Sequence, residues 1–328
     1  MERYARACVD HAVAAYLAPA SSVFFGGGTP SLLPAELLVA ILEALPRRPG
    51  AEVSVECNPE TVTPALLRAY RHAGVTRLSL GVQSMDPDVL GSLGRHHDPA
   101  TVRHAVAAAG DAGFAENYSV DLIFGAAGES MDQWRQTLDR VLALEPAPAH
   151  VSAYGLTVEA GTPLAADVAR HPDPDDQADK YAVTDEVLGE AGLAWYEISN
   201  WARPGAECDH NRLYWRQGEY RGIGCAAHSH RVLGDSTAKR WWNVRTPERY
   251  AGLVEQGRDP EAAAEVLDVQ ARRSESLILA LRTRDGVPSS ALADDPVLDG
   301  LVELSGDRKM LTLRGRLLAN EVAARLRV

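Results

Sequence analysis

The feature that most constrains the fold is a regular alternation of short β-rich runs with longer segments of helical periodicity. Such an alternation is typical of βαβ units, which build a parallel sheet in an α/β fold. Because five such units follow one another, we expect a barrel-type sheet rather than an open Rossmann sheet. The expected strands are residues 21–25, 51–57, 77–83, 118–125 and 150–156, and the expected helices are residues 34–45, 63–74, 102–113, 131–144 and 179–192.

The end of the chain has a different character, with helices, a hairpin expected at residues 308–316 and a final helix. That order is similar to a winged helix, whose usual association is DNA. Acidic residues are interspersed and no helix is strongly basic, so DNA binding is disfavoured. We therefore expect two domains, a β/α barrel at residues 1–232 and a small helical, winged-helix-like domain at residues 233–328.

Composition excludes several classes of partner. The chain has 328 residues and a net charge of −12, which argues against nucleic acid or an anionic membrane as a partner. No apolar run approaches the length of about 20 residues that a membrane helix needs. Residues 1–17 suggest an amphipathic helix rather than a secretory signal. The four cysteines have no close pairing, which favours reduced thiols and a cytoplasmic location.

A glycine cluster follows the first expected strand, in the stretch VFFGGGTPSLL at residues 23–33. Glycines at the end of a strand usually let a ligand approach the backbone closely. The spacing is not G-x-G-x-x-G, and no Gly-Lys-Ser/Thr follows. Neither phosphate-binding fingerprint is therefore present.

Polar residues stand at the carboxyl ends of the next expected strands, where β/α folds bind their ligands. Each could have a structural role alone, as a turn, a helix cap or a buried carboxylate satisfied by amides. Their succession instead predicts a common cleft, suited to a ligand with an ammonium group and hydroxyls. The positions are Gly26–Thr29, Glu56 with Asn58, Gln83 with Ser84, and Asp121.

A second informative stretch concentrates cysteine, histidine and aromatic side chains at residues 208–230. A zinc site is one interpretation, although the spacing matches no standard zinc module. A set of turn and packing residues is another. The residues are Cys208, His210, Tyr214, Trp215, Cys225, His228 and His230.

Taken together, these motifs carry a resemblance to a known family. GGGTPSLL, VECNPETV, RLSLGVQS, LGRHHD, VDLIFG and YEISNWARPG with CDHNRLYW resemble the radical S-adenosylmethionine family of oxygen-independent coproporphyrinogen III oxidases. The heme chaperone branch of that family matches best, and the resemblance covers almost the whole chain. It implies three cofactors or ligands: S-adenosylmethionine, a [4Fe-4S] cluster and heme.

The resemblance also assigns residues. Gly27, Gly28 and Thr29 would touch the methionyl end of S-adenosylmethionine, where backbone groups can meet its ammonium. The remaining cofactor-contacting positions would be Glu56, Gln83, Arg95, Asp121 and His228. Arg95 rests on the resemblance alone, because GRHHD by itself could be a solvated loop.

A heme site is implied by the His-Asn-x-x-Tyr-Trp motif, which is complete here as His210, Asn211, Tyr214 and Trp215. Imidazole is a common axial ligand of heme iron, and flanking aromatic rings can cover a porphyrin face. The resemblance therefore makes His210 the expected axial ligand.

The cluster-binding Cys-x-x-x-Cys-x-x-Cys loop of the family is missing from this sequence. Three thiolates at that spacing would leave one iron open to chelate the cofactor. The sequence begins where the family's first helix is expected, so we expect a partial barrel without its first strand. Either the start is placed too late, or the chain is shortened and lacks radical chemistry.

Three functions stay open at this point. The first is heme binding and delivery by a chaperone, the second is oxidative decarboxylation of coproporphyrinogen III, and the third is a non-catalytic remnant. The intact HNRLYW motif at residues 210–215 favours the first. Heme-acceptor proteins and an electron donor are the partners that the resemblance implies.

Overall fold

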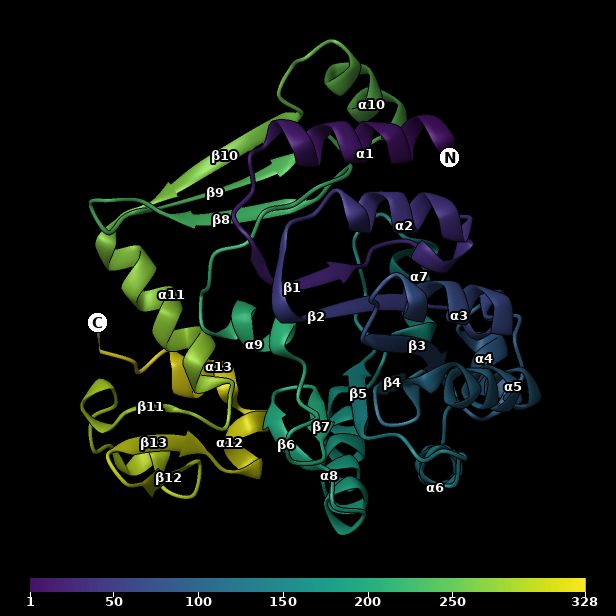
Figure 1. Ribbon diagram of the computed structural model, residues 1–328. Helices are drawn as coiled ribbons and strands as arrows, with labels where there is room; N and C mark the ends of the chain where they lie inside the picture. The colour runs from purple at the N-terminus through teal and green to yellow at the C-terminus, as the bar shows by residue number, and fades with distance from the viewer. Residues whose placement is uncertain (328) are drawn as a thin grey trace. The chain divides into compact units, whose positions relative to one another are not determined.

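A computed structural model describes residues 1–327 as an α/β fold whose main sheet has seven strands in the order β1-β2-β3-β4-β5-β7-β6 (Figure 1). Strand β3 pairs parallel with β2 and β4, and β4 pairs parallel with β5, whereas β7 pairs antiparallel with both β5 and β6. The sheet forms a half-barrel, as predicted. Its strands are β1 Ala20–Phe25, β2 Arg47–Cys57, β3 Arg77–Gln83, β4 Tyr118–Phe124, β5 His150–Gly155, β6 Ala194–Glu197 and β7 Asn200–Ala202.

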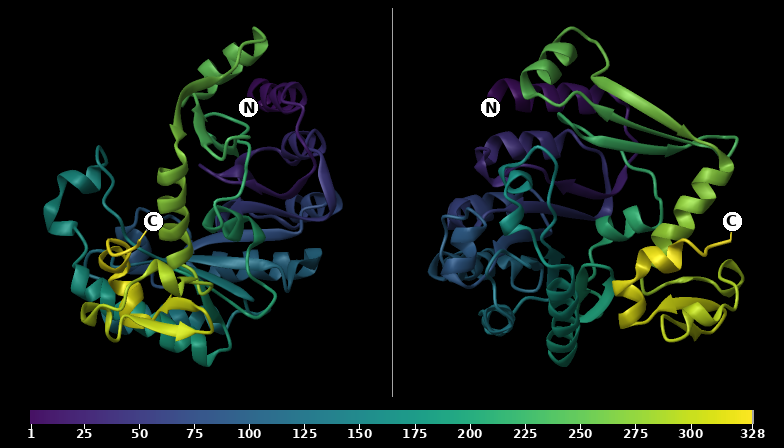
Figure 2. Two further views of the ribbon diagram at one scale, coloured as in Figure 1. Left: turned by 90° about the vertical axis from the view of Figure 1, so that its left-hand side faces the viewer. Right: turned by 180° about the vertical axis from the view of Figure 1, so that it is seen from behind.

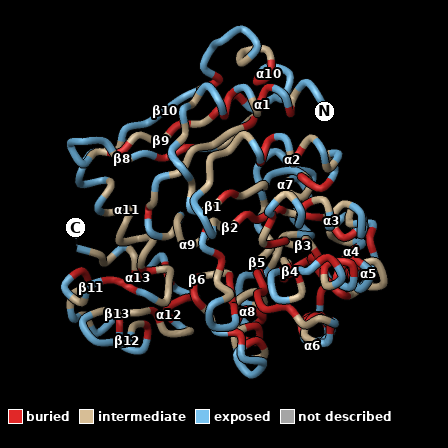
Figure 3. The backbone as a smooth tube through the Cα atoms, viewed as in Figure 1, coloured by how far each residue is buried: buried red, intermediate tan, exposed pale blue. Residues whose placement is uncertain are grey.

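The apolar side chains of the central strands are buried on one face of the sheet. Leu78, Leu80 and Val82 of β3 are fully buried, and so are Val120 and Leu122 of β4. The residues between them along each strand are half-buried, so apolar and half-buried positions alternate with the period of a strand, which explains why these strands could be predicted. Figure 3 shows many buried residues in β3 to β5 and exposed residues in the surrounding loops.

Helices connect the parallel strands, and several begin at a side-chain cap. Thr63, Asp98 and Asp173 each accept a hydrogen bond from a backbone N–H of the first turn, and Ser130 forms a capping box with Gln133. The predicted helices are present, with α8 beginning at residue 174 rather than 179, whereas the short α4 and α7 were not predicted. The bounds are α1 Glu2–Ala14, α2 Ala35–Glu43, α3 Pro64–His72, α4 Pro87–Ser92, α5 Pro99–Ala109, α6 Met131–Leu142, α7 Pro163–Ala166 and α8 Pro174–Glu190.

The chain divides into two compact units. The first, called the α9 unit here, comprises residues 1–23, 33–51 and 208–328, and the second, called the strand-end unit, comprises residues 24–32 and 52–207. The α9 unit contains an antiparallel sheet of order β10-β9-β8 and a small sheet of order β11-β13-β12 (Figure 2). Its later elements are α9 Asp209–Trp215, β8 His228–Val232, β9 Ala238–Asn243, α10 Pro247–Glu255, β10 Glu261–Leu267, α11 Val269–Leu281, β11 Val287–Pro288, β12 Val302–Ser305, β13 Arg308–Leu311, α12 Leu313–Leu317 and α13 Ala319–Ala323.

The C-terminal hairpin lies earlier than predicted. β12 and β13 pair antiparallel around a turn at residues 306–307, while residues 313–316, predicted as part of the hairpin, belong to α12. Thr312 caps that helix by accepting the Gly315 N–H. The predicted domain boundary falls at the end of β8, which pairs with β9, and that division stays a proposal.

Within residues 1–327, no helix is both long and apolar enough to cross a membrane.

Candidate functional sites

The glycine turn after β1 is held against the end of β2. Gly27 and Gly28 have φ of +81° and +68°, a backbone region that favours glycine. The Gly27 N–H donates a hydrogen bond of 3.0 Å to Oε2 of Glu56. At Gly26, a Cβ would lie 2.2 Å from the Phe24 ring, so only glycine fits there. Gly27 and Gly28 are therefore favoured by their backbone conformation, and Gly26 by the close approach of the Phe24 ring.

The rest of the turn is joined to the residues that follow β2. Nδ2 of Asn58 donates to Oγ1 of Thr29 at 3.2 Å, and the Asn58 N–H donates to Oγ of Ser31 at 3.3 Å. Oγ of Ser31 also lies 2.5 Å from Oγ1 of Thr61. The strand-end unit therefore brings Thr29, Glu56 and Asn58 together, as expected from their positions at neighbouring strand ends.

Gln83 ends β3 in an unusual conformation. Its φ is +65°, which a non-glycine residue rarely adopts and which often marks a functional position. A Cβ on Gly81 would lie 3.0 Å from Nε2 of Gln83 and 3.3 Å from Oδ1 of Asn58. Gly81 therefore leaves the room in which the two carboxamides approach each other.

The loop that holds Arg95 is anchored by a buried histidine that sequence reasoning missed. His97 is 6% exposed, its Nε2 lies 2.9 Å from the Val82 carbonyl oxygen, and its Nδ1 lies 3.4 Å from Oε2 of Glu60. The imidazole thus joins the loop to the end of β3, next to Gln83. The GRHHD motif is anchored rather than fully solvated, and Arg95 itself is half-buried.

Asp121 lies on β4 and is half-buried, as Glu56 is. Its Oδ2 accepts a hydrogen bond of 2.6 Å from Oγ of Ser79, and Ser152 also donates to it. Burial raises the pKa of Asp121, and the two serine hydroxyls and Arg77 oppose that rise. The carboxylate is therefore harder to ionise than a solvated one.

The charge of Asp121 adds to the effect of burial on Glu56. Burial raises the pKa of Glu56, the Gly27 N–H lowers it in part, and the negative charge of Asp121 raises it again. Two acids that resist ionisation in one site favour a cationic ligand, because a positive charge would stabilise both carboxylates. A glycine turn, two carboxyls and a carboxamide thus have the chemistry to suit an ammonium-bearing ligand better than a phosphate.

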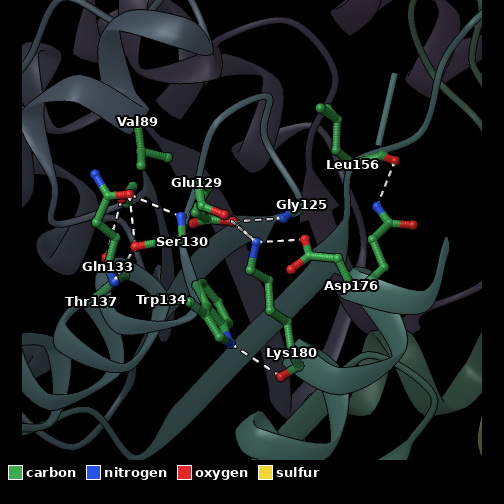
Figure 4. Close-up of polar contacts among 12 residues, drawn as sticks. Val89, Gly125, Glu129, Ser130, Gln133, Trp134, Thr137, Leu156, Asp176 and Lys180 are labelled. Atoms are coloured by element: carbon green, nitrogen blue, oxygen red, sulfur yellow. Dashed lines mark hydrogen bonds and ion pairs between the residues drawn. The ribbon is translucent and has the colours of Figure 1, made fainter. Parts of the chain in front are cut away.

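The turn after β4 is fixed by a buried ion pair (Figure 4). Nζ of Lys180 on α8 donates to the Glu129 carbonyl oxygen and to Oδ2 of Asp176, both at 2.7 Å, and lies 3.3 Å from Oε2 of Glu129. That carboxylate also accepts the Gly125 N–H at 2.7 Å. The turn that immediately follows the strand of Asp121 is therefore closed by charge-assisted hydrogen bonds.

His228, the remaining predicted cofactor contact, lies at the start of β8 in the α9 unit. Its ring is exposed and stacks on Trp242 of β9, with centroids 5.6 Å apart. Its role toward a cofactor stays a prediction.

The HNRLYW motif forms helix α9. His210 is 8% exposed, with Nδ1 2.9 Å from Oγ of Ser22 on β1 and Nε2 3.0 Å from Oη of Tyr214, one turn along the same helix. Burial lowers the pKa of His210 to about 4, so its imidazole is neutral at pH 7. Neutral imidazole is the form that binds metals.

Aromatic rings extend from this histidine. Tyr214 packs edge-on against both His210, at 4.8 Å between centroids, and Tyr220, at 4.7 Å. Tyr214 is 39% exposed, whereas Asn211 and Trp215 are half-buried. The motif thus combines an enclosed imidazole with a partly exposed phenol ring.

The cysteines do not form a metal centre. Among residues 1–327, no three His, Cys, Asp or Glu side chains are grouped so that they could hold a metal ion. The hypothesis of a zinc site at residues 208–230 is therefore wrong. Cys8 and Cys225 both contact Tyr4, and burial raises the pKa of Cys8 to about 11. The cysteines among residues 1–327 therefore do not fit a [4Fe-4S] cluster.

Comparisons with known proteins agree with the fold and the motifs. The Radical SAM superfamily model matches residues 2–141. A heme chaperone HemW from Mycobacterium tuberculosis is 42% identical over 320 residues, covering 93% of this chain and 80% of that protein. One from Escherichia coli is 33% identical over 315 residues, covering 92% and 82%. The structure of coproporphyrinogen III oxidase (HemN) from E. coli matches with a TM-score of 0.79 at 21% identity, covering 99% of this chain and 84% of that chain.

The half-barrel and the strand-end residues define a radical SAM-type protein with the fold of HemN. Within that class, the chain belongs to the heme chaperone HemW family, since relatives of that name match it along nearly its whole length. The resemblance inferred from the motifs is confirmed.

Proposed function

We propose that this protein is a heme chaperone that binds heme at helix α9, with His210 as the axial ligand of the iron. The observation that carries the proposal is the environment of His210: an enclosed, neutral imidazole beside a partly exposed tyrosine ring. Neutral imidazole can coordinate heme iron, and aromatic rings pack well against a porphyrin. Family membership supports the same assignment.

A hemin titration tests the heme site. We expect the wild-type protein to shift the Soret band of hemin saturably, and His210→Ala to weaken binding strongly. Cys57→Ala is the control, because Cys57 is buried in the strand-end unit and is expected to leave the titration unchanged. Binding that is indifferent to His210 but lost in His228→Ala would move the ligand elsewhere.

The same protein is proposed to bind S-adenosylmethionine at the strand ends. Glu56 and Asp121 would face the ammonium and ribose hydroxyls, and the backbone of Gly27 and Gly28 would lie along the methionyl group. The raised pKa values of the two carboxyls support this proposal, since a cation would stabilise their ionised forms. Thr29, Gln83, Arg95 and His228 remain proposed contacts.

Calorimetry with S-adenosylmethionine tests the second site. S-adenosylhomocysteine has a neutral thioether in place of the sulfonium but keeps the ammonium, so both compounds are expected to bind if the ammonium is recognised. Decarboxylated and deaminated analogues would separate the two ends of the amino acid. Loss of binding on deamination, but not on removal of the methyl group, is the expected pattern.

Coproporphyrinogen oxidation is the alternative function. The likeness to HemN supports the fold alone at 21% identity, and the complete HNRLYW motif favours the chaperone. Absence of hemin binding combined with turnover of coproporphyrinogen III would reverse that preference.

A further inference from the structure

Both ring nitrogens of His210 already have hydrogen-bond partners. Nδ1 lies 2.9 Å from Oγ of Ser22, and Nε2 lies 3.0 Å from Oη of Tyr214. A ring nitrogen must offer its lone pair to bind iron, and a hydrogen bond at that nitrogen occupies the same direction. His210 can therefore coordinate heme only if one of these two partners moves away.

The two partners differ in how easily they can move. Ser22 belongs to β1, a strand of the main sheet, and its short side chain has little freedom. Tyr214 is 39% exposed and lies on helix α9, so turning its ring toward solvent would break its edge contacts with His210 and Tyr220 but no pairing within a sheet. Nε2 is thus the nitrogen that can be uncovered.

The chemistry of the two hydroxyls indicates the tautomer. A neutral imidazole has one N–H and one lone pair. A phenol is a much stronger hydrogen-bond donor than an aliphatic alcohol, since it is the more acidic group, and its oxygen is the weaker acceptor. The favoured arrangement therefore has the Tyr214 O–H donating to Nε2 and the Nδ1–H donating to Oγ of Ser22. In this arrangement Nε2 carries the lone pair that a metal needs.

We propose that Tyr214 is a removable cap on the iron-binding nitrogen of His210, and that Ser22 is the positioning residue that sets the tautomer. The inference rests on the proposed heme site. When the phenol swings away, Nε2 exchanges an O–H···N hydrogen bond for a bond to iron, and no proton has to leave the imidazole. The released phenol hydroxyl is then hydrated. The bond to Ser22 stays and orients the ring, as outer-shell partners of metal-binding histidines do.

Two substitutions should change hemin affinity in opposite directions. Tyr214→Phe keeps the ring and removes the cap, so hemin should bind more tightly, by roughly 2- to 12-fold for one ordinary hydrogen bond. Ser22→Ala removes the orienting acceptor, so hemin should bind about 10-fold more weakly or worse. If Tyr214 and Ser22 only supported the local structure, both Tyr214→Phe and Ser22→Ala would weaken hemin binding.

Matched controls exist for each change. Tyr220→Phe alters the neighbouring ring of the aromatic row without touching His210, and Ser21→Ala alters the exposed residue beside Ser22. Both should leave hemin affinity unchanged. Ser22→Thr retains a hydroxyl and should rescue the loss in Ser22→Ala, which also separates a folding defect from loss of the hydrogen bond.

Nitrogen NMR of the heme-free protein gives a readout that does not depend on heme. With labelled histidine, His210 should show a protonated Nδ1 in the wild type and in Tyr214→Phe, and a mixture of tautomers in Ser22→Ala. Weaker hemin binding by a folded Tyr214→Phe, or a protonated Nε2 in the wild type, would overturn the inference. If the wild type showed no saturable, His210-dependent hemin binding, the proposed heme site would fail instead, whatever the tautomer.

Discussion

The two candidate sites differ in how well their polar groups are satisfied before any ligand binds. At the strand ends, burial raises the pKa values of Glu56 and Asp121, and the charge of Asp121 raises that of Glu56 further. At helix α9, His210 is neutral and already hydrogen-bonded at both ring nitrogens. The first site gains electrostatic stabilisation as soon as a cation enters, whereas the second must break an existing hydrogen bond first.

This difference implies different binding behaviour. A site held in an unfavourable protonation state lowers the stability of the free protein and recovers it on binding. A site whose polar groups already form hydrogen bonds with one another leaves the free protein stable. Breaking one of those bonds on binding reduces the apparent affinity for the ligand. We therefore expect the raised pKa values of the two carboxyls to favour binding of S-adenosylmethionine, whereas the hydrogen bonds of His210 oppose binding of hemin.

The largest expected effect tests the scaffold beside the acidic site. Lys180→Met leaves Glu129 as a buried carboxylate without its cation, and breaking such a pair costs about 3–5 kcal/mol. Urea unfolding should show this loss. Arg3→Met removes a surface pair with Glu255, where the side chains are 58% and 46% exposed, and should change nothing measurable.

A double substitution sharpens that test. Lys180→Met combined with Glu129→Leu removes both charges, so it should be less destabilising than Lys180→Met alone. If Lys180→Met were as stable as the wild type, the pair would not support the turn after β4.

The second prediction compares the pH dependence of the two units. In the α9 unit, burial and Arg221 lower the pKa of His11 to about 4, while Asp259 raises it slightly. The unfolded state therefore binds more protons between pH 6.5 and 4. The contribution of His11 to stability is complete above pH 6.5 and declines toward pH 4, by on the order of 3 kcal/mol.

His11→Gln should flatten this slope in urea unfolding measured at several pH values. Glu56 and Asp121, whose pKa values are raised in the folded protein, act in the opposite sense. Their contribution to stability is complete below the pKa that they have in the unfolded chain, and it is lost as the pH rises through the pKa that they have in the folded protein. Asp121→Asn should accordingly stabilise the free protein at pH 7. A destabilised Asp121→Asn at that pH would contradict the contrast between the sites.

Whether a feature of the fold or of a candidate site could be predicted from the sequence depends on how far apart in the chain the contacting residues are. The parallel strands and the polar residues at their ends follow from local patterns, so Gly27 and Glu56 could be expected to meet. Ser22 is 188 positions from His210, and no local signal links them. Asp176 and Lys180 have the spacing of an exposed i,i+4 pair, yet the lysine side chain is fully buried.

The third prediction concerns ligand affinity at the acidic site. Glu56→Gln keeps a partner for the Gly27 N–H through its carbonyl oxygen but removes the charge that would face an ammonium. Loss of a charge-assisted hydrogen bond should weaken S-adenosylmethionine binding by roughly 10- to 100-fold, measured by calorimetry. Hemin affinity should not change. Equal weakening of both ligands would show that the substitution damages the fold rather than one site.

The smallest effect comes from the glycine turn. Gly27 has φ of +81° and Gly50, outside the proposed site, has φ of +76°, and in both cases an added Cβ would meet nothing within 4 Å. Alanine at either position should therefore cost a similar backbone strain of about 1 kcal/mol.

Only Gly27→Ala places a methyl group where the methionyl end of S-adenosylmethionine is proposed to lie. Calorimetry should accordingly show weaker binding in Gly27→Ala and unchanged binding in Gly50→Ala, while urea unfolding shows nearly equal losses. Unchanged binding in both variants would mean that the ligand does not approach the turn at Gly27, and the acidic site would then have to recognise its cation through side chains alone.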